Sequence, residues 1–111
     1  MIETKGYAAQ NPETDLAVWK FERREVGPSD VQIAILFCGV CHSDLHQLKN
    51  EWFPGLFPMV PGHEIVGKII KIGSSVKKFK VGDLAGVGCM VDSCRTCSNC
   101  QKGLEQYCLN G

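Results

Sequence analysis

The distribution of apolar and polar residues along the chain predicts a domain built mainly from β-strands. β-Branched, aromatic and other apolar residues gather in four short runs, at residues 16–23, 31–37, 64–72 and 84–87. Glycine, proline and aspartate, which favour turns, separate these runs. Short strands broken by glycines are typical of a small irregular barrel, and we expect a mostly β fold of that kind.

One clear helix is expected, at residues 43–50. Ser43 is a favourable N-cap, and Asp44 suits the first turn. Beyond the last expected strand, residues 89–108 show little apolar periodicity. Something other than a hydrophobic core must therefore hold that stretch.

Composition and charge narrow the classes of partner. The chain has 111 residues, enough for one domain, and 12 basic residues balance 12 acidic ones. A net charge of zero does not suggest a nucleic acid or an anionic membrane as partner. One group of lysines is a candidate nucleic-acid patch: Lys68, Lys71, Lys77, Lys78 and Lys80. Because it lacks arginine and has one aromatic neighbour, we interpret it as a solvated strand edge.

The N-terminus and the apolar runs indicate a cytoplasmic chain. Residues 1–5 include an acidic residue and no apolar stretch, unlike a signal peptide. The longest apolar run, residues 33–41, is far too short to span a bilayer. Five of the seven cysteines lie between Cys89 and Cys108. In a reducing compartment, such clusters bind metal more often than they form disulfides.

Four of these cysteines have the spacing of a structural metal site. Cys94, Cys97, Cys100 and Cys108 form a C-x2-C-x2-C-x7-C pattern. Zinc prefers four tetrahedral ligands, and four thiolates leave no open position for a substrate. An iron–sulfur cluster is the main alternative, but a final gap of seven without a following proline departs from ferredoxin spacing. Four unligated buried cysteines fit this polar loop less well than a metal does.

A second group of candidate ligands surrounds the expected helix. Cys41 and His63 are plausible zinc ligands, and Glu64 is a further or outer carboxylate. Ser43 and His46 lie three residues apart on one helix face, where a hydroxyl and an imidazole could pass a proton to solvent. Taken alone, these residue types near glycines belong more often to packing or surface than to a site.

The order of the motifs is more specific than any one of them. Residues 39–46 (GVCHSDLH), residues 61–67 (PGHEIVG), residues 81–83 (VGD), the four-cysteine pattern and residues 103–108 (GLEQYC) follow one another. Together they resemble the zinc-dependent medium-chain alcohol dehydrogenases, and most of all their cinnamyl-alcohol-dehydrogenase-like branch. The resemblance implies that residues 1–111 are the N-terminal part of a GroES-like catalytic domain, with a structural zinc lobe at residues 89–111.

The resemblance also assigns the metal ligands. It implies that Cys41 and His63 hold a catalytic zinc, with Glu64 as the acid beside it, an outer or exchanging ligand. It implies that the four cysteines of the lobe hold a structural zinc. Cys38 and Cys89 match no ligand position, and we expect Cys38 to lie in a strand and to belong to the protein core.

The implied reaction interconverts a primary alcohol and an aldehyde with NADP or NAD. Zinc would act as a Lewis acid on the substrate oxygen, while Ser43 would take the substrate proton and His46 would pass it outward. His42 matches the position that contacts the pyrophosphate of the cofactor. The branch resembled usually prefers NADP, and the parent enzyme would be a cytoplasmic homodimer.

Several parts of such an enzyme are not found in the 111 residues. No further cysteine follows Cys108, and residues 86–91 lack the third glycine of a dinucleotide-binding turn and run into the cysteine lobe. We therefore expect the nucleotide-binding domain to be absent and the chain to be an N-terminal fragment that is inactive alone.

Two other functions and one ambiguity remain open. A non-enzymatic zinc-binding interaction module would explain the lobe but not the residues around Cys41. A thiol redox sensor would use Cys38, Cys41 or Cys89. Four large residues between the ligand segments either border a substrate cleft or pack within an irregular loop: Trp52, Phe53, Phe57 and Met59.

Overall fold

The computed structural model describes residues 1–52 and 54–111, so Phe53 lies outside the described residues. Its elements, in chain order, are β1 (Ile2–Ala8), β2 (Ala17–Arg23), β3 (Val31–Gly39), α1 (His42–Leu48), β4 (Glu64–Ile72), β5 (Leu84–Val87), α2 (Ser98–Gln101) and the 3-10 turn η1 (Glu105–Tyr107). The expectation of a mostly β chain is confirmed, and two of the expected strands, β4 and β5, have the predicted bounds.

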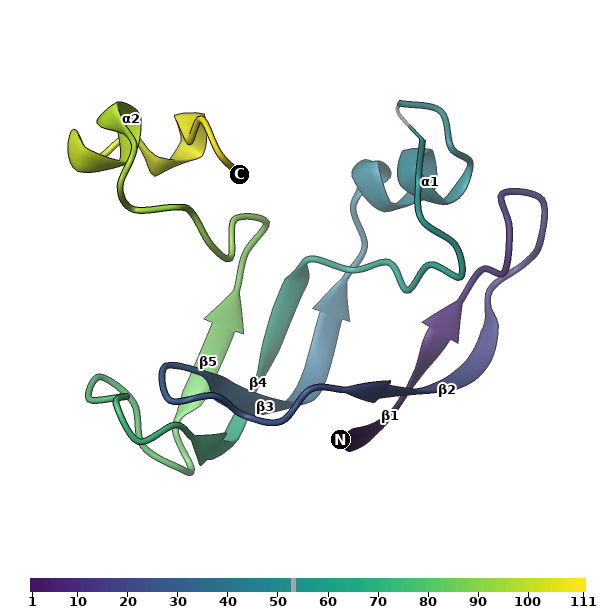
Figure 1. Cartoon of the computed structure of the whole chain (residues 1–111). Helices are drawn as coiled ribbons and strands as arrows, with labels where there is room; N and C mark the ends of the chain where they lie inside the picture. Colours follow the sequence, from purple (N-terminus) through teal and green to yellow (C-terminus); the bar gives the residue numbers. More distant parts are fainter. Residues whose placement is uncertain (53) are drawn as a thin grey trace.

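The strands form two antiparallel sheets, whose strands are labelled in Figure 1. One sheet pairs β1 with β2, and the other has the order β3-β4-β5. An isolated bridge between Ala9 and Met59 ties the end of the first sheet to the segment that follows α1. Within the described residues the strands do not close into a barrel, so the barrel expected from the glycine-broken strands is present only as its open sheets.

Buried residues of the larger sheet lie on its central strand, β4. Gly67 and Ile69 are buried, and Ile69 is fully so. A side chain at Gly67 would overlap the carbonyl oxygen of Ala34 and a methyl group of Ile33 on β3. The sequence therefore has glycine where the two strands approach most closely.

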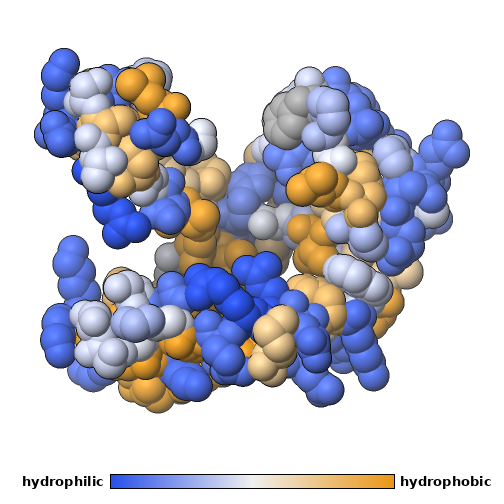
Figure 2. All heavy atoms as spheres, in the orientation of Figure 1, coloured by the Kyte–Doolittle hydropathy of each residue, from blue (hydrophilic) through white to orange (hydrophobic). Residues whose placement is uncertain are grey.

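The second half of β3 is exposed, which corrects the expectation for Cys38. Phe37 has 72% of its surface exposed, and Cys38 is exposed as well. A core position for Cys38 would require other structure to cover this part of β3. Within the described residues, however, no second layer covers this half of the strand, and apolar side chains reach the surface in Figure 2.

Helix α1 begins one residue earlier than expected and ends two residues earlier. Its N-cap is Cys41 instead of Ser43, because Cys41 still has the extended backbone that continues from β3. The Asp44 carboxylate, three residues on, accepts a hydrogen bond from the Cys41 backbone N–H at 3.1 Å. This junction places a sulfur atom where strand becomes helix.

The C-terminal cysteine lobe is a third unit, which in Figure 1 stands apart from α1 beyond the end of β5. Its short elements α2 and η1 contact each other. Neither was expected from the sequence, since residues 89–108 have no apolar periodicity. In the described part of the chain, no helix has both the length and the apolar character that crossing a membrane requires.

Candidate metal centres

The four cysteines of the C-terminal lobe converge as their spacing predicts. The sulfur atoms of Cys94, Cys97, Cys100 and Cys108 all lie within 4.8 Å of one another. The Cys94 and Cys100 sulfurs are 3.9 Å apart. Four thiolates at about 2.3 Å from one zinc ion would have sulfur–sulfur distances of about 3.8 Å. The donor set and its dimensions therefore fit a tetrahedral metal.

Backbone N–H groups point at these sulfurs. The amide of Cys97 donates to the Cys94 sulfur at 3.2 Å, and that of Cys100 donates to the Cys97 sulfur at 3.5 Å. The amide of Cys94 donates to the Cys108 sulfur at 3.4 Å. Arg95 supports the first turn with a left-handed backbone, φ 62°. The two-residue spacers thus form tight turns that aim both sulfur and amide inward.

The pKa values of two thiols in this cluster, Cys94 and Cys100, differ widely. Hydrogen bonds from the Asn110 side chain and from the backbone of Thr96 and Cys97 lower the pKa of Cys94 to about 5. A Ser93 hydrogen bond lowers the pKa of Cys100, but burial and the neighbouring sulfurs outweigh it and raise that pKa to about 11. Close thiols cannot all ionise without a cation, so a bound metal must displace the remaining protons.

A second convergence of ligand atoms lies where β3 and β4 meet. One ligand atom from each of Cys41, His63 and Glu64 lies within 4.8 Å of the other two. Gly39 at the end of β3 pairs with Glu64 at the start of β4. Because neighbouring antiparallel strands bring the end of one beside the beginning of the next, residues 22 positions apart arrive together (63 − 41).

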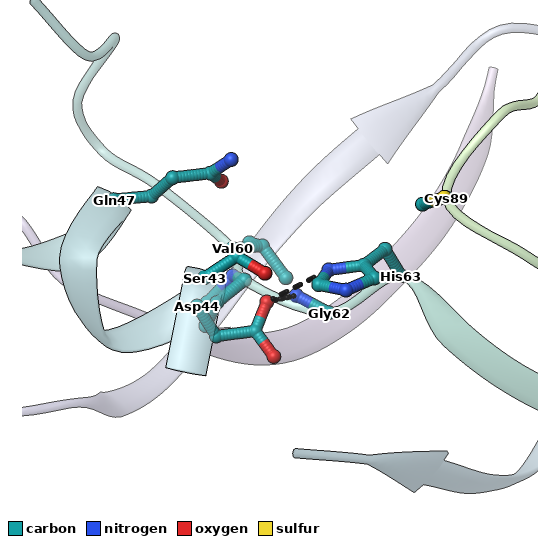
Figure 3. Close-up of a pocket in the computed structure, with 8 residues that line it drawn as sticks. Ser43, Asp44, Gln47, Val60, Gly62, His63 and Cys89 are labelled. Carbon is teal, nitrogen blue, oxygen red and sulfur yellow. Dashed lines mark hydrogen bonds and ion pairs between the residues drawn. The ribbon is translucent and has the colours of Figure 1, made fainter. Parts of the chain in front are cut away.

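Asp44 holds this convergence together, a role that sequence reasoning missed. Its carboxylate is buried, with 6% exposed, and accepts hydrogen bonds from the backbone N–H groups of Cys41 and Gly62, each at 3.1 Å. It also lies 3.1 Å from Nδ1 of His63, as the dashed line in Figure 3 shows. When Nδ1 carries the proton, Nε2 remains free to bind a metal. The sequence showed Asp44 only as a favourable residue for the first helical turn.

The chemistry of Cys41 and His63 is coupled. Hydrogen bonds from the side chain and the backbone of Ser43, and then from His63, lower the pKa of the Cys41 thiol. The Cys41 sulfur raises the pKa of His63 against the effect of burial, and the Asp44 charge adds to this. Each group thus shifts the other toward its charged form. A metal that binds this pair takes the place of any proton on the Cys41 sulfur and on the His63 nitrogen that it contacts.

The expected relay residues lie on α1 but point to different partners. The Ser43 hydroxyl oxygen is 3.0 Å from the Cys41 sulfur, inside the metal group. His46 Nδ1 is 2.9 Å from a Glu51 carboxylate oxygen, and its ring stacks on Trp52 with centroids 4.7 Å apart. No hydrogen bond in the described residues joins Ser43 to His46. His42 is exposed at the first position of the helix.

Two cavities flank α1. The first, of about 210 Å³, is lined in part by Ser43, Asp44, His63 and Cys89. Figure 3 shows Cys89 on the far side of the His63 ring from Asp44. The second, of about 330 Å³, is lined by Gln47, Trp52, Pro54, Gly55, Leu56 and Met59. Two of the four residues expected at a cleft, Trp52 and Met59, thus border a cavity; Phe57 does not, and Phe53 is not described.

Comparison with known proteins places this geometry in a family. The family described as "Alcohol dehydrogenase GroES-like domain" matches residues 27–111. The chain belongs to the alcohol dehydrogenase GroES-like domain family. Cinnamyl alcohol dehydrogenase 2 of Rauvolfia serpentina and 8-hydroxygeraniol dehydrogenase of Catharanthus roseus are each 53% identical to it over 107 residues, or 96% of the chain.

Solved structures confirm the GroES-like fold and the resemblance to cinnamyl alcohol dehydrogenases. CAD from Helicobacter pylori, solved in complex with NADP(H), is 47% identical and superimposes on 97% of the chain with a TM-score of 0.93. The chain covers 31% of that structure and 30% of the length of each of the two plant relatives. The similarity therefore covers less than a third of those proteins.

Proposed function

We propose that this GroES-like domain supplies two zinc centres to an alcohol dehydrogenase that interconverts a primary alcohol and an aldehyde with NADP or NAD. The observation that carries the proposal is the convergence of Cys41, His63 and Glu64, locked by the buried Asp44. The two plant relatives are named as dehydrogenases, and the Helicobacter pylori structure was solved with NADP(H). A non-enzymatic zinc module would not need this second, open ligand set.

The two centres have different roles. Cys94, Cys97, Cys100 and Cys108 offer four ligands, which close the coordination shell and make that site structural. Cys41, His63 and Glu64 leave room for a substrate, and Glu64 is the exposed member that can exchange. A zinc ion held there would supply Lewis-acid chemistry, lowering the pKa of an alcohol hydroxyl.

The residues of α1 would then move the proton. Ser43 borders the first cavity beside His63, so its hydroxyl is placed to accept a proton from a substrate in that cavity. His46 is the outer member, and its contact with Glu51 turns the ring toward a solvent-exposed carboxylate. His42, exposed at the start of the helix, is the residue proposed to contact the pyrophosphate of the cofactor.

The remaining parts of the proposal concern the parent protein. The 111 residues contain no dinucleotide-binding turn, so we propose that the hydride acceptor binds elsewhere in the parent and that the 111-residue chain alone is inactive. The parent is proposed to be a cytosolic homodimer that acts on a small alcohol or aldehyde.

Metal stoichiometry of separate variants tests the two centres. The chain loaded with zinc should hold one tightly bound ion, lost in Cys97→Ser, and a second, weaker one, lost in His63→Ala but kept in Cys97→Ser. Zinc assay after dialysis, with a chelating dye to rank affinity, measures both. A chain with no bound metal and freely alkylated lobe thiols would contradict the structural centre. Alcohol oxidation by the isolated 111 residues would contradict the proposal that this chain alone is inactive.

A further inference from the structure

Asn110 lies against the metal-binding lobe but is not one of its candidate ligands. Its side-chain amide nitrogen is 3.5 Å from the sulfur of Cys94 and is placed to donate to it. The same sulfur accepts the backbone N–H of Cys97 at 3.2 Å. Cys94 is the first of the four clustered cysteines and Asn110 follows the last, so this contact joins the two ends of the cluster across 16 residues.

The contact between Asn110 and Cys94 would offset negative charge on the sulfur atoms of a metal-loaded lobe. Four thiolates around one zinc ion carry two more negative charges than the metal neutralises. N–H groups directed at the sulfurs offset that excess, and hydrogen bonds to charged acceptors are among the stronger ones in proteins. The lobe draws most of these donors from its own backbone, at Cys94, Cys97 and Cys100. Asn110 adds a donor from a side chain, which a substitution can remove while leaving the backbone unchanged.

We propose that Asn110 is a positioning residue of the four-cysteine metal centre, and that its N–H···S bond to Cys94 holds this ligand in place and strengthens metal binding. The inference rests on the proposed structural zinc. Groups that hydrogen-bond to ligands from outside the coordination shell commonly change metal affinity by about 10–100-fold. Because Asn110 is exposed, we expect the lower end of that range.

The test uses the whole 111-residue chain with three substitutions. Asn110→Ala removes the donor, and Asn110→Asp keeps the shape but puts a carboxylate beside the thiolate. Gln101→Ala is the matched control, because Gln101 is an exposed amide side chain in α2 whose side chain makes no hydrogen bond in the described residues. Competition with a chelating dye gives the zinc dissociation constant, and cobalt(II) loading gives the energy of the thiolate-to-metal charge-transfer band.

The expected result is a dissociation constant about 10-fold higher for Asn110→Ala, higher still for Asn110→Asp, and within about twofold of the parent for Gln101→Ala. The charge-transfer band should move to lower energy in Asn110→Ala, because a sulfur without its donor is richer in electrons. A purely structural role would not move that band. If Asn110→Ala fails to fold, Asn110→Asp carries the test alone, since it preserves shape.

Unchanged affinity in both Asn110 variants, or an unshifted band, would overturn the role of Asn110 while leaving the metal centre intact. A parent chain that binds no metal at its four cysteines would instead overturn the structural zinc itself, and the role of Asn110 with it. The two failures are therefore separated by the measurement on the unsubstituted chain.

Discussion

Asp44→Asn is the substitution that tests how the second metal centre is built. The Asp44 carboxylate, with 6% exposed, accepts hydrogen bonds from the backbone of Cys41 and Gly62 and lies against Nδ1 of His63, all at 3.1 Å. An asparagine of the same shape keeps one oxygen but turns an NH2 group toward at least one of these donors. The substitution thus removes the charge and leaves a buried N–H facing another N–H.

The magnitude follows from the hydrogen bonds that the substitution removes. A hydrogen bond to a charged group is worth about 1.5–3 kcal/mol, and an unsatisfied buried polar group costs about 1–3 kcal/mol. These contributions overlap, so we expect the free energy of unfolding to fall by about 2–4 kcal/mol, about as much as a large core truncation. Zinc affinity at Cys41 and His63 should fall by about 10–100-fold, because the orientation of His63 is no longer fixed.

Urea unfolding of the metal-free chain and chelator competition on the zinc-loaded Cys97→Ser background measure these two effects separately. Asp15→Asn is the matched control, since Asp15 is exposed and its side chain makes no hydrogen bond in the described part of the chain. It should change the free energy of unfolding by less than about 0.5 kcal/mol. If Asp44→Asn matched that control in both measurements, the carboxylate would not be what joins the two ligand segments.

Three further predictions concern the sheet and the lobe. Gly67→Ala should destabilise the chain by about 1–3 kcal/mol, because its methyl group would overlap β3. Gly86→Ala in the same sheet is the control and should destabilise the chain less, because the nearest atom is 3.6 Å from an added Cβ. Equal free energies of unfolding for the two variants would contradict this. Arg95→Gly should be about 1 kcal/mol more stable than Arg95→Ala, because glycine adopts the left-handed backbone without strain. Both variants lose the ion pair with Asp92, so the comparison isolates the backbone effect. Equal free energies of unfolding for the two variants in chemical denaturation would count against it. The pKa of Cys94 is about 5 in the folded lobe, below the ordinary 9.0, so its thiolate stabilises that fold fully above pH 9 and loses this contribution as pH falls through about 5. When metal removal unfolds the lobe, the thiolate absorbance should disappear near the ordinary pKa; disappearance near 5 in the metal-free chain would be the contrary outcome.

The sequence predicted the strands better than it predicted what covers them. The bounds of β4 and β5 follow from local alternation and from the glycines at their ends, which are properties of the strands themselves. Whether Cys38 is buried depends on a second layer of structure, and no local pattern contains that information. The apolar run of β3 was therefore identified correctly as a strand, whereas the core position expected for Cys38 was wrong.

In the candidate sites too, local sequence features predicted some contacts, and others became visible only in the fold. Spacing alone predicted the four-cysteine cluster, because short gaps force nearby sulfurs together wherever the rest of the chain lies. Residue type made Cys41 and His63 plausible zinc ligands, and the family resemblance then assigned both to one catalytic zinc, because local spacing does not show that such distant residues meet. Asp44 escaped notice since an aspartate in a first helical turn has a sufficient local explanation as a cap. Only the fold showed that the same carboxylate reaches Gly62 and His63.

The two metal centres have different physical origins and should respond independently. The Cys41–His63 group is built on the register of β3 with β4, in which Gly39 pairs with Glu64, and is locked by buried hydrogen bonds. The lobe contributes only one buried hydrophobic residue, Cys100, which is itself a ligand, and its elements α2 and η1 pack on each other. Apolar burial of this size cannot offset the entropy of ordering about twenty residues, so the metal must supply that free energy. Removing metal from the lobe should therefore unfold residues 89–111 while the hydrogen bonds around Asp44 persist, because their partners are Cys41, Gly62 and His63, outside the lobe.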